Sequence, residues 1–108
     1  MGAAMERARL LQEIRVRLEQ AYGPCLRGVV LHGSEARGDA TSDSDIDVLV
    51  LLDGPISLAA DLNKIIHALY PLQLETQRVI EAFPVAYADY EAGSYALYRN
   101  AKREGVLL

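Results

Sequence analysis

The sequence predicts a small α/β or α+β domain, in which a small mixed sheet is flanked by helices. Two observations predict this class. Two short apolar runs rich in β-branched residues are typical of buried strands, and longer segments with apolar residues every three or four positions lie before, between and after them. With 108 residues and a mass of 11.9 kDa, the chain is long enough for one hydrophobic core. We therefore expect residues 1–108 to form a single domain.

The pattern of apolar residues, together with glycine and proline, predicts the order of the elements. In order, these are a helix over residues 4–22, a strand over 26–32, a helical turn over 34–38, a polar loop over 39–44, a strand over 45–52, a helix from 58 to about 71, an extended segment over 76–87 and a last helix from about 95. Pro71 is expected to end the third of the helical segments. Pro84 indicates that the last extended segment lies at an edge of the sheet or in a bulge.

Composition and charge exclude several classes of protein. A chain with 51% apolar and 24% charged residues is typical of a folded globular protein rather than a disordered one. Its net charge of −4 provides no broad basic surface, so nucleic acid is not the expected partner. A single cysteine, Cys25, excludes an internal disulfide and a Cys-based zinc site. The sequence contains no apolar run long enough to span a membrane and no secretory signal, so a cytoplasmic location is expected.

Two acidic residues stand at the start of the second predicted strand. Residues two apart in a strand point to the same face, roughly 6.5–7 Å apart, so Asp45 and Asp47 should present their carboxylates side by side. Two such carboxylates repel each other unless a cation lies between them. Mg²⁺ prefers oxygen ligands and keeps positions open for phosphate oxygens and water. The pair therefore predicts a magnesium site.

A glycine and a serine lie where the first predicted strand ends and a helical turn begins. The backbone N–H groups of such a junction can bind phosphate, Gly33 allows a close approach, and Ser34 adds a hydroxyl. Arg37 follows one turn later and could bind a phosphate through two hydrogen bonds. A phosphate cradle next to a carboxylate pair is what metal-assisted nucleotidyl transfer requires. The sequence has neither a P-loop nor a dinucleotide-binding glycine pattern.

Together, Gly33-Ser34-x-x-Arg37-Gly38 and Ser44-Asp45-Ile46-Asp47 resemble the two-part motif of the DNA polymerase β-type nucleotidyltransferases. The length and the order of the elements are similar to those of the minimal nucleotidyltransferases (MNT proteins). The motif match covers about residues 29–52, and the last six residues are similar to the ending of many members.

This resemblance implies a polymerase β-like nucleotidyltransferase fold, Mg²⁺ with two ions, and ATP as the nucleotide donor. It also implies that Gly33, Ser34, Arg37 and Ser44 bind the nucleotide and that Asp45 and Asp47 bind metal. Minimal members are typically paired with a small helical HEPN protein. In such toxin–antitoxin pairs the nucleotidyltransferase is the antitoxin and transfers AMP to a tyrosine of the toxin. Whether the chain forms a homo- or a hetero-oligomer stays open.

The family also uses a third carboxylate from a neighbouring strand, which binds metal and helps to activate the acceptor. Glu81 is our candidate because it lies in the third extended segment, and Asp89 and Glu91 are alternatives near the turn before the last helix. At Glu35 the chain departs from relatives that often have a basic residue there, which removes one phosphate contact.

Two other functions are compatible with the same residues. One is a catalytically degenerate binding module that neutralises its partner by forming a complex, which the lack of a third carboxylate would favour. The other is nucleotidyl transfer to a small molecule such as an aminoglycoside, although enzymes of that kind generally carry an additional domain.

Overall fold

The computed structural model describes residues 6–41 and 44–108 and consists of five helices, one 3₁₀ turn and four strands. Along the chain these elements are α1 (Arg7–Tyr22), η1 (Gly23–Cys25), β1 (Leu26–His32), α2 (Gly33–Arg37), β2 (Ile46–Leu52), α3 (Leu58–Thr76), β3 (Ile80–Ala86), α4 (Tyr87–Ala92), α5 (Ala96–Glu104) and β4 (Val106–Leu107). No described helix is long and apolar enough to cross a membrane.

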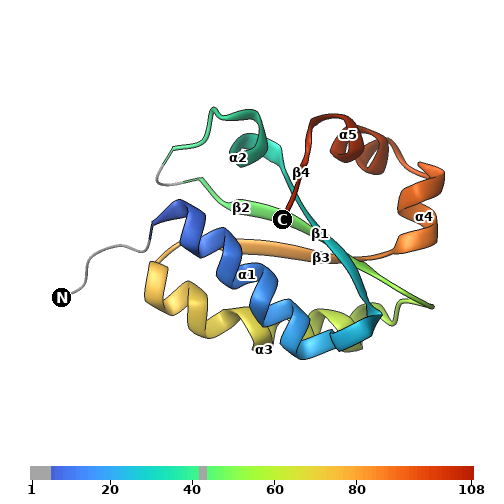
Figure 1. Ribbon diagram of the computed structural model, residues 1–108, viewed down its shortest axis with the longest axis horizontal. Coiled ribbons are helices and arrows are strands. Elements are labelled where there is room, and N and C mark those ends of the chain that lie inside the picture. Colours follow the sequence, from blue (N-terminus) through green and yellow to red (C-terminus); the bar gives the residue numbers. More distant parts are fainter. Residues whose placement is uncertain (1–5, 42–43) are drawn as a thin grey trace.

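The four strands form one mixed sheet in the order β3-β2-β1-β4 (Figure 1). The β1 and β4 strands are antiparallel, as are β1 and β2, whereas β2 and β3 are parallel. The parallel pair needs a crossover connection, and α3 provides it. This architecture confirms the predicted small mixed sheet flanked by helices.

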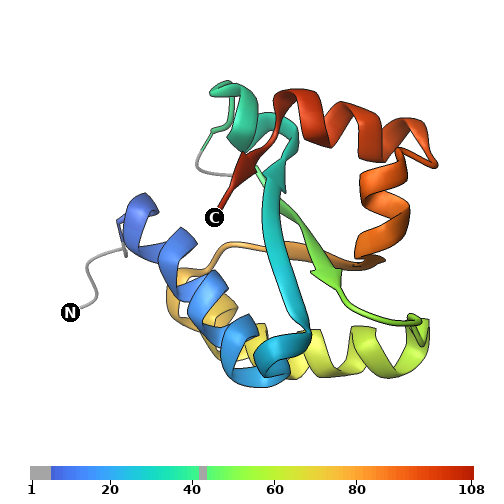
Figure 2. The same cartoon turned by 45° about the vertical axis from the view of Figure 1, so that its right-hand side comes forward.

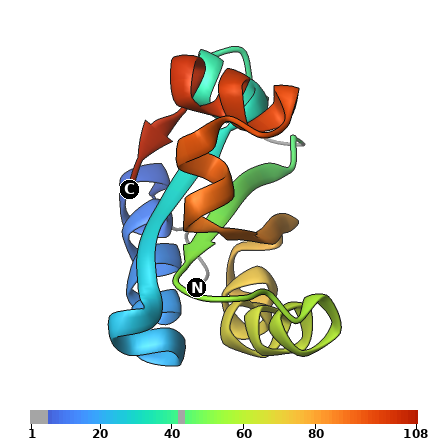
Figure 3. The same ribbon diagram turned by 90° about the vertical axis from the view of Figure 1, so that its right-hand side faces the viewer.

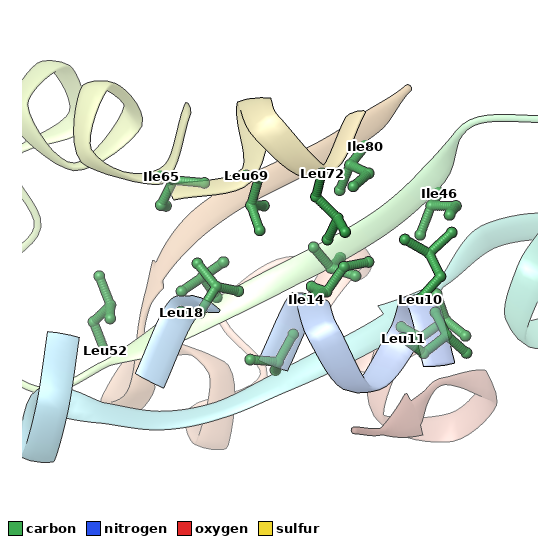
Figure 4. Close-up of a cluster of buried hydrophobic side chains, with 14 residues drawn as sticks. Leu10, Leu11, Ile14, Leu18, Ile46, Leu52, Ile65, Leu69, Leu72 and Ile80 are labelled. Atoms are coloured by element: carbon green, nitrogen blue, oxygen red, sulfur yellow. The ribbon is translucent and has the colours of Figure 1, made fainter. Parts of the chain in front are cut away.

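Both faces of the sheet are covered, and successive strand residues alternate between them. Side chains such as Val29, Leu31, Val48 and Val50 pack with α1 and α3, and Figure 4 shows part of this cluster. On the opposite face, Val30, Leu49, Leu51 and Val85 pack with Tyr90 of α4 and Ala101 of α5. In Figure 2 these two pairs of helices lie on opposite sides of the strands. Because both faces are buried there, residues 29–31 of β1 and 48–52 of β2 are continuous apolar runs rather than alternating ones.

Most of the predicted elements are confirmed, with shifts at their ends. The first strand has the predicted bounds, the second begins at Ile46 rather than Asp45, and α2 begins at Gly33 instead of Ser34. Within the predicted first helix, residues 4 and 5 lie outside the described part, as do residues 42 and 43 of the predicted polar loop.

The predicted end of a helix at Pro71 is wrong, because α3 continues to Thr76. Leu69 and Leu72 on either side of the proline are buried against the sheet, whereas Pro71 itself is exposed, so packing holds the helix across it. The helix ends where Gln77 takes a left-handed conformation with φ 57° and donates its N–H to the Gln73 carbonyl at 2.8 Å.

The predicted extended segment over residues 76–87 is too long. Its ends belong to α3 and α4, and the strand occupies Ile80–Ala86. As Pro84 indicated, β3 is an edge strand. Neither α4 nor the two-residue strand β4 was predicted from the sequence, because neither is long enough to show a period.

Candidate active site

Three polar side chains lie in one row across the sheet, at the end where β1 stops and β2 begins. His32 pairs with Asp47 between β1 and β2, and Asp47 pairs with Glu81 between β2 and β3. All three share the sheet face of Val30, Leu49 and Val85, which α4 and α5 cover farther along. The structure therefore brings Glu81, 34 positions away in the sequence, beside the aspartate pair.

The acidic residues influence one another strongly. Asp45 lies one residue before β2 and is exposed, Asp47 is half-buried and Glu81 is exposed. A hydrogen bond with Asp45, together with the negative charges of Asp45 and Asp47, raises the pKa of Glu81 above its usual value. The three acids therefore concentrate negative charge at this end of the sheet.

The residue at position 33 has to be glycine. Its φ of 71° lies in the left-handed region, and a β-carbon there would lie 2.6 Å from Oδ2 of Asp47. The absence of a side chain thus lets the end of β1 pass directly beside the carboxylate. This contact joins the predicted phosphate cradle to the predicted metal ligands.

The other predicted nucleotide-binding residues lie around this junction, and each forms a hydrogen bond with a residue nearby in the sequence. Ser34 is half-buried in α2, and its carbonyl accepts the N–H groups of Gly38 and Asp39. Arg37 is exposed, with its Nε 3.4 Å from Asp39. The Ser44 hydroxyl accepts the N–H of Thr41 at 2.9 Å, so it caps the loop in this arrangement. Of these three, Arg37 lines the pocket described next.

Two pockets flank His32. The cradle pocket, of about 260 Å³, is lined by Gly33 and Arg37 on one side and by Asn100 and Glu104 of α5 on the other. The acid pocket, of about 360 Å³, is lined by residues from the three neighbouring strands and α5: His32, Asp47, Val48, Leu49, Glu81, Ala82, Phe83 and Leu97. Both pockets also share Leu97. The site therefore has a polar half beside the glycine and a more apolar half beside the acids.

The contribution of α5 was missed in the sequence analysis. Its polar and apolar faces were visible, but no motif indicated that Leu97, Asn100 and Glu104 would face the end of β1. Figures 1 and 3 show α5 beside α2 at one end of the molecule, although almost 60 residues separate the two helices.

His32 lies between the two pockets. Burial lowers the pKa of its imidazole, and the negative charge of Asp47 offsets part of that effect. The imidazole is therefore neutral at pH 7 and adds no positive charge to the acidic row.

The alternative candidates for the third carboxylate lie elsewhere. Asp89 and Glu91 are on α4, and Glu91 faces a separate pocket, where its carboxylate lies 3.5 Å from Nζ of Lys102. Of the three candidates, only Glu81 lies in register with Asp47.

The donor set suits a hard divalent cation, because the row offers carboxylate oxygens and no sulfur. Within residues 6–41 and 44–108, however, no three His, Cys, Asp or Glu side chains are placed so that they could hold one ion together. The carboxylates of Asp45, Asp47 and Glu81 would therefore have to turn toward a shared ion before they could bind it together.

Known proteins resemble this chain along most of its length. The family described as "Nucleotidyltransferase domain" matches residues 11–88. Over 105 residues the chain is 29% identical to a candidate protein adenylyltransferase from Methanocaldococcus jannaschii, and the match covers 96% of this chain and 99% of the relative. The 1.40 Å crystal structure of a candidate nucleotidyltransferase from Sulfolobus solfataricus has a TM-score of 0.63 at 21% identity, covering 92% of this chain and 76% of the other. That structural likeness shows a shared fold.

Proposed function

Because the chain belongs to the nucleotidyltransferase domain family, we propose that it transfers AMP from Mg–ATP to a tyrosine hydroxyl of a helical HEPN partner and thereby acts as an antitoxin. The observation that carries this proposal is the row of Asp47 and Glu81 in register, with Gly33 directly against the Asp47 carboxylate. This arrangement supports a site that combines a phosphate cradle with a set of acids.

The donor nucleotide would lie with its phosphates in the cradle pocket. Gly33 leaves the backbone open to a phosphate there, and the guanidinium of Arg37 is exposed and able to turn from Asp39 toward it. The salt bridge between Arg37 and Asp39 is on the surface, where such pairs contribute little, so this movement costs little. Asp45, Asp47 and Glu81 would hold Mg²⁺, which neutralises the triphosphate and the departing pyrophosphate when it is bound.

The acceptor would enter the acid pocket. Its more apolar wall, formed by Ala82, Phe83 and Leu97, suits an aromatic ring, and Asp47 and Glu81 stand at its polar edge. The tyrosine oxygen forms a bond to the α-phosphorus, while the bond from that phosphorus to the β-bridging oxygen breaks and pyrophosphate leaves with the electron pair. Glu81, at the polar edge of this pocket, would take the phenol proton.

Two observations support a protein as the acceptor. The Methanocaldococcus relative is named as a candidate protein adenylyltransferase. In addition, α3 exposes four apolar side chains that are each more than half exposed: Leu58 and, at four-residue spacing, Ile66, Tyr70 and Leu74. A surface of this kind is commonly covered by another protein.

The test is to co-purify the chain with the product of the neighbouring gene, which we expect to be a helical protein, and to determine the intact mass of that product with and without Mg–ATP. We expect the partner to gain one or more AMP units. Asp45→Asn and Asp47→Asn should abolish the gain while the protein stays folded, because each removes an anionic metal ligand. Asp53→Asn is the matched control, since Asp53 pairs with Arg27 away from the site.

Each outcome has a clear consequence. A complex that forms tightly but never gains mass supports the binding module instead and contradicts the proposed transfer. A gain in mass that persists undiminished in Asp47→Asn contradicts the assigned site. Transfer of labelled AMP to an aminoglycoside, with none to the partner, would assign a small-molecule acceptor.

A further inference from the structure

We propose that Arg78 is a positioning residue that holds the cradle, the aspartate pair and Glu81 in one arrangement for the transfer proposed above, on which this inference rests. Arg78 lies in the short segment between α3 and β3 and touches no pocket of the site. Its side chain instead joins the segments that carry the site residues.

The guanidinium of Arg78 contacts two segments that are separate in the sequence. Its Nη1 lies 3.5 Å from Oε1 of Glu35, which follows Gly33 and Ser34 in α2. Its Nη2 donates a hydrogen bond of 2.7 Å to the carbonyl of Ser44, the residue before Asp45. One planar group therefore links the cradle helix to the start of β2.

The backbone next to Arg78 also contacts the start of β2. The carbonyl of Val79 accepts the N–H of Ile46 at 2.9 Å, which starts the pairing between β2 and β3. This contact sets the register in which Asp47 lies opposite Glu81, three positions after Arg78. Any shift of the Arg78 segment would therefore move Glu81 relative to both aspartates.

Glu35 anchors the Arg78 guanidinium because it is buried and is also bound by a second arginine. At 6% exposure it is the one buried charged residue in the described part of the chain. A second arginine, Arg7 of α1, donates to its side chain at 3.3 Å and to its backbone carbonyl at 3.2 Å. From the sequence alone, Glu35 was expected to remove a phosphate contact, but its side chain points into the protein toward two arginines.

Stability alone does not explain such a network. Removing charges from water is costly, and apolar residues of similar size often replace a buried ion pair without loss of stability. The Nε of Arg78 is also buried without a hydrogen-bond partner among the described residues, which is a further cost. The network instead fixes a geometry, because the planar, forked guanidinium of Arg78 holds Glu35 and the Ser44 carbonyl at set positions relative to each other.

The first test compares Arg78→Lys with Arg17→Lys. A lysine keeps the charge, but its single ammonium group cannot bridge Glu35 and Ser44 as the fork does. Arg17 is the matched control because its 3.3 Å pair with Glu13 lies within α1. We expect calorimetry with Mg–ATP to show about tenfold weaker binding for Arg78→Lys and no change for Arg17→Lys. In the transfer assay with the helical partner, we expect kcat to fall about 10- to 100-fold for Arg78→Lys.

The second test separates positioning from folding. In the double variant Glu35→Leu/Arg78→Met, apolar side chains of similar length replace the ion pair. We expect its melting temperature to equal or exceed that of the wild type, while binding of Mg–ATP and kcat fall as in Arg78→Lys. A residue with a purely structural role would lose activity only in proportion to stability.

The outcomes distinguish this inference from the function on which it rests. Wild-type protein that neither binds Mg–ATP nor transfers AMP would overturn both proposals. Wild-type protein that binds Mg–ATP without transfer would overturn the transfer, and the binding data would then decide the role of Arg78. If the wild type is active and both variants keep its affinity and kcat, the positioning role is overturned alone.

Discussion

At the scale of single residues, Gly33 and Asp47 constrain each other. The carboxylate of Asp47 occupies the space that a side chain on residue 33 would need, so neither residue can be changed without affecting the other. Asp47 also lies between His32 and Glu81 in the row across the sheet. The site therefore depends on a few close contacts rather than on a large cavity.

We expect Gly33→Ala to destabilise the protein by about 1–2 kcal/mol, the usual cost of a left-handed conformation for a residue with a β-carbon. It should also push the Asp47 carboxylate aside and abolish binding of Mg–ATP. Gly38→Ala is the matched control, because Gly38 has φ 82° but its β-carbon would meet nothing within 4 Å. Denaturant unfolding and calorimetry measure both effects, and equal loss of binding in the two variants would contradict the prediction.

Glu81→Gln tests the repulsion within the acidic row. The pKa of Glu81 is raised in the folded protein, so its contribution to stability is present below its unfolded pKa, about 4.3, and is lost as the pH rises through the folded value. Without divalent cations, Glu81→Gln should therefore raise the melting temperature at pH 7, and this gain should disappear on acidification.

Magnesium should reverse the order of the melting temperatures of the wild type and Glu81→Gln. At millimolar Mg²⁺ we expect the wild type to gain more in melting temperature than Glu81→Gln, because the ion binds the folded state through the carboxylates. The exposed Glu75 provides a control, since Glu75→Gln should change neither the pH dependence nor the response to Mg²⁺. An identical response to Mg²⁺ in wild type and Glu81→Gln would remove Glu81 from the set of metal ligands.

At the scale of elements, α3 shows how packing overrides local preference. The helix continues through Pro71, which lacks the N–H that would bond the carbonyl four residues earlier. Its inner face, with Ile65, Leu69 and Leu72, is almost completely buried, and this burial exceeds the cost of the proline.

Pro71→Ala should consequently stabilise the protein by about 1–3 kcal/mol, because it restores the missing bond and removes the clash of the ring. The exposed position of Pro71 allows this change without loss of core packing. Thermal and denaturant unfolding measure the gain. Pro24→Ala in η1 provides a comparison outside a long helix, where no such gain is expected. A loss of stability in Pro71→Ala would contradict this account of α3.

At the scale of the whole molecule, the C-terminal segment closes the structure around β1. After α5, β4 pairs with β1, the N–H of Leu108 bonds the Val29 carbonyl at 2.9 Å, and Arg15 of α1 donates to the Leu108 carbonyl. This closure holds α5 over the site, where Leu97 lines both pockets.

Gly105→Ala should disrupt that closure. A β-carbon on Gly105 would lie 2.3 Å from the Ala101 carbonyl oxygen and 2.9 Å from that of Leu31, so α5 and β4 have to move. We expect a loss of about 1–3 kcal/mol in unfolding free energy and slower transfer of AMP. Gly28→Ala, whose β-carbon would meet only side chains at 3.4 Å and beyond, should cost clearly less. Equal losses in the two variants would contradict this account of the closure.

The sequence by itself determined the class of fold, the bounds of β1 and the candidate residues of the two-part motif. These features are local: Gly33 and Asp47 are only 14 positions apart, and a strand places alternate residues on one face whatever surrounds it. The same local logic made Glu81 the preferred third acid, with Asp89 and Glu91 left as alternatives.

Only the tertiary structure decided which residues, distant in the sequence, lie next to one another. The parallel pairing of β2 with β3 put Glu81 opposite Asp47, burial carried α3 past Pro71, and the fold turned Glu35 inward to Arg78. Each of these results depends on contacts between residues distant in sequence, where register, burial and charge pairing outweigh the preferences of single residues.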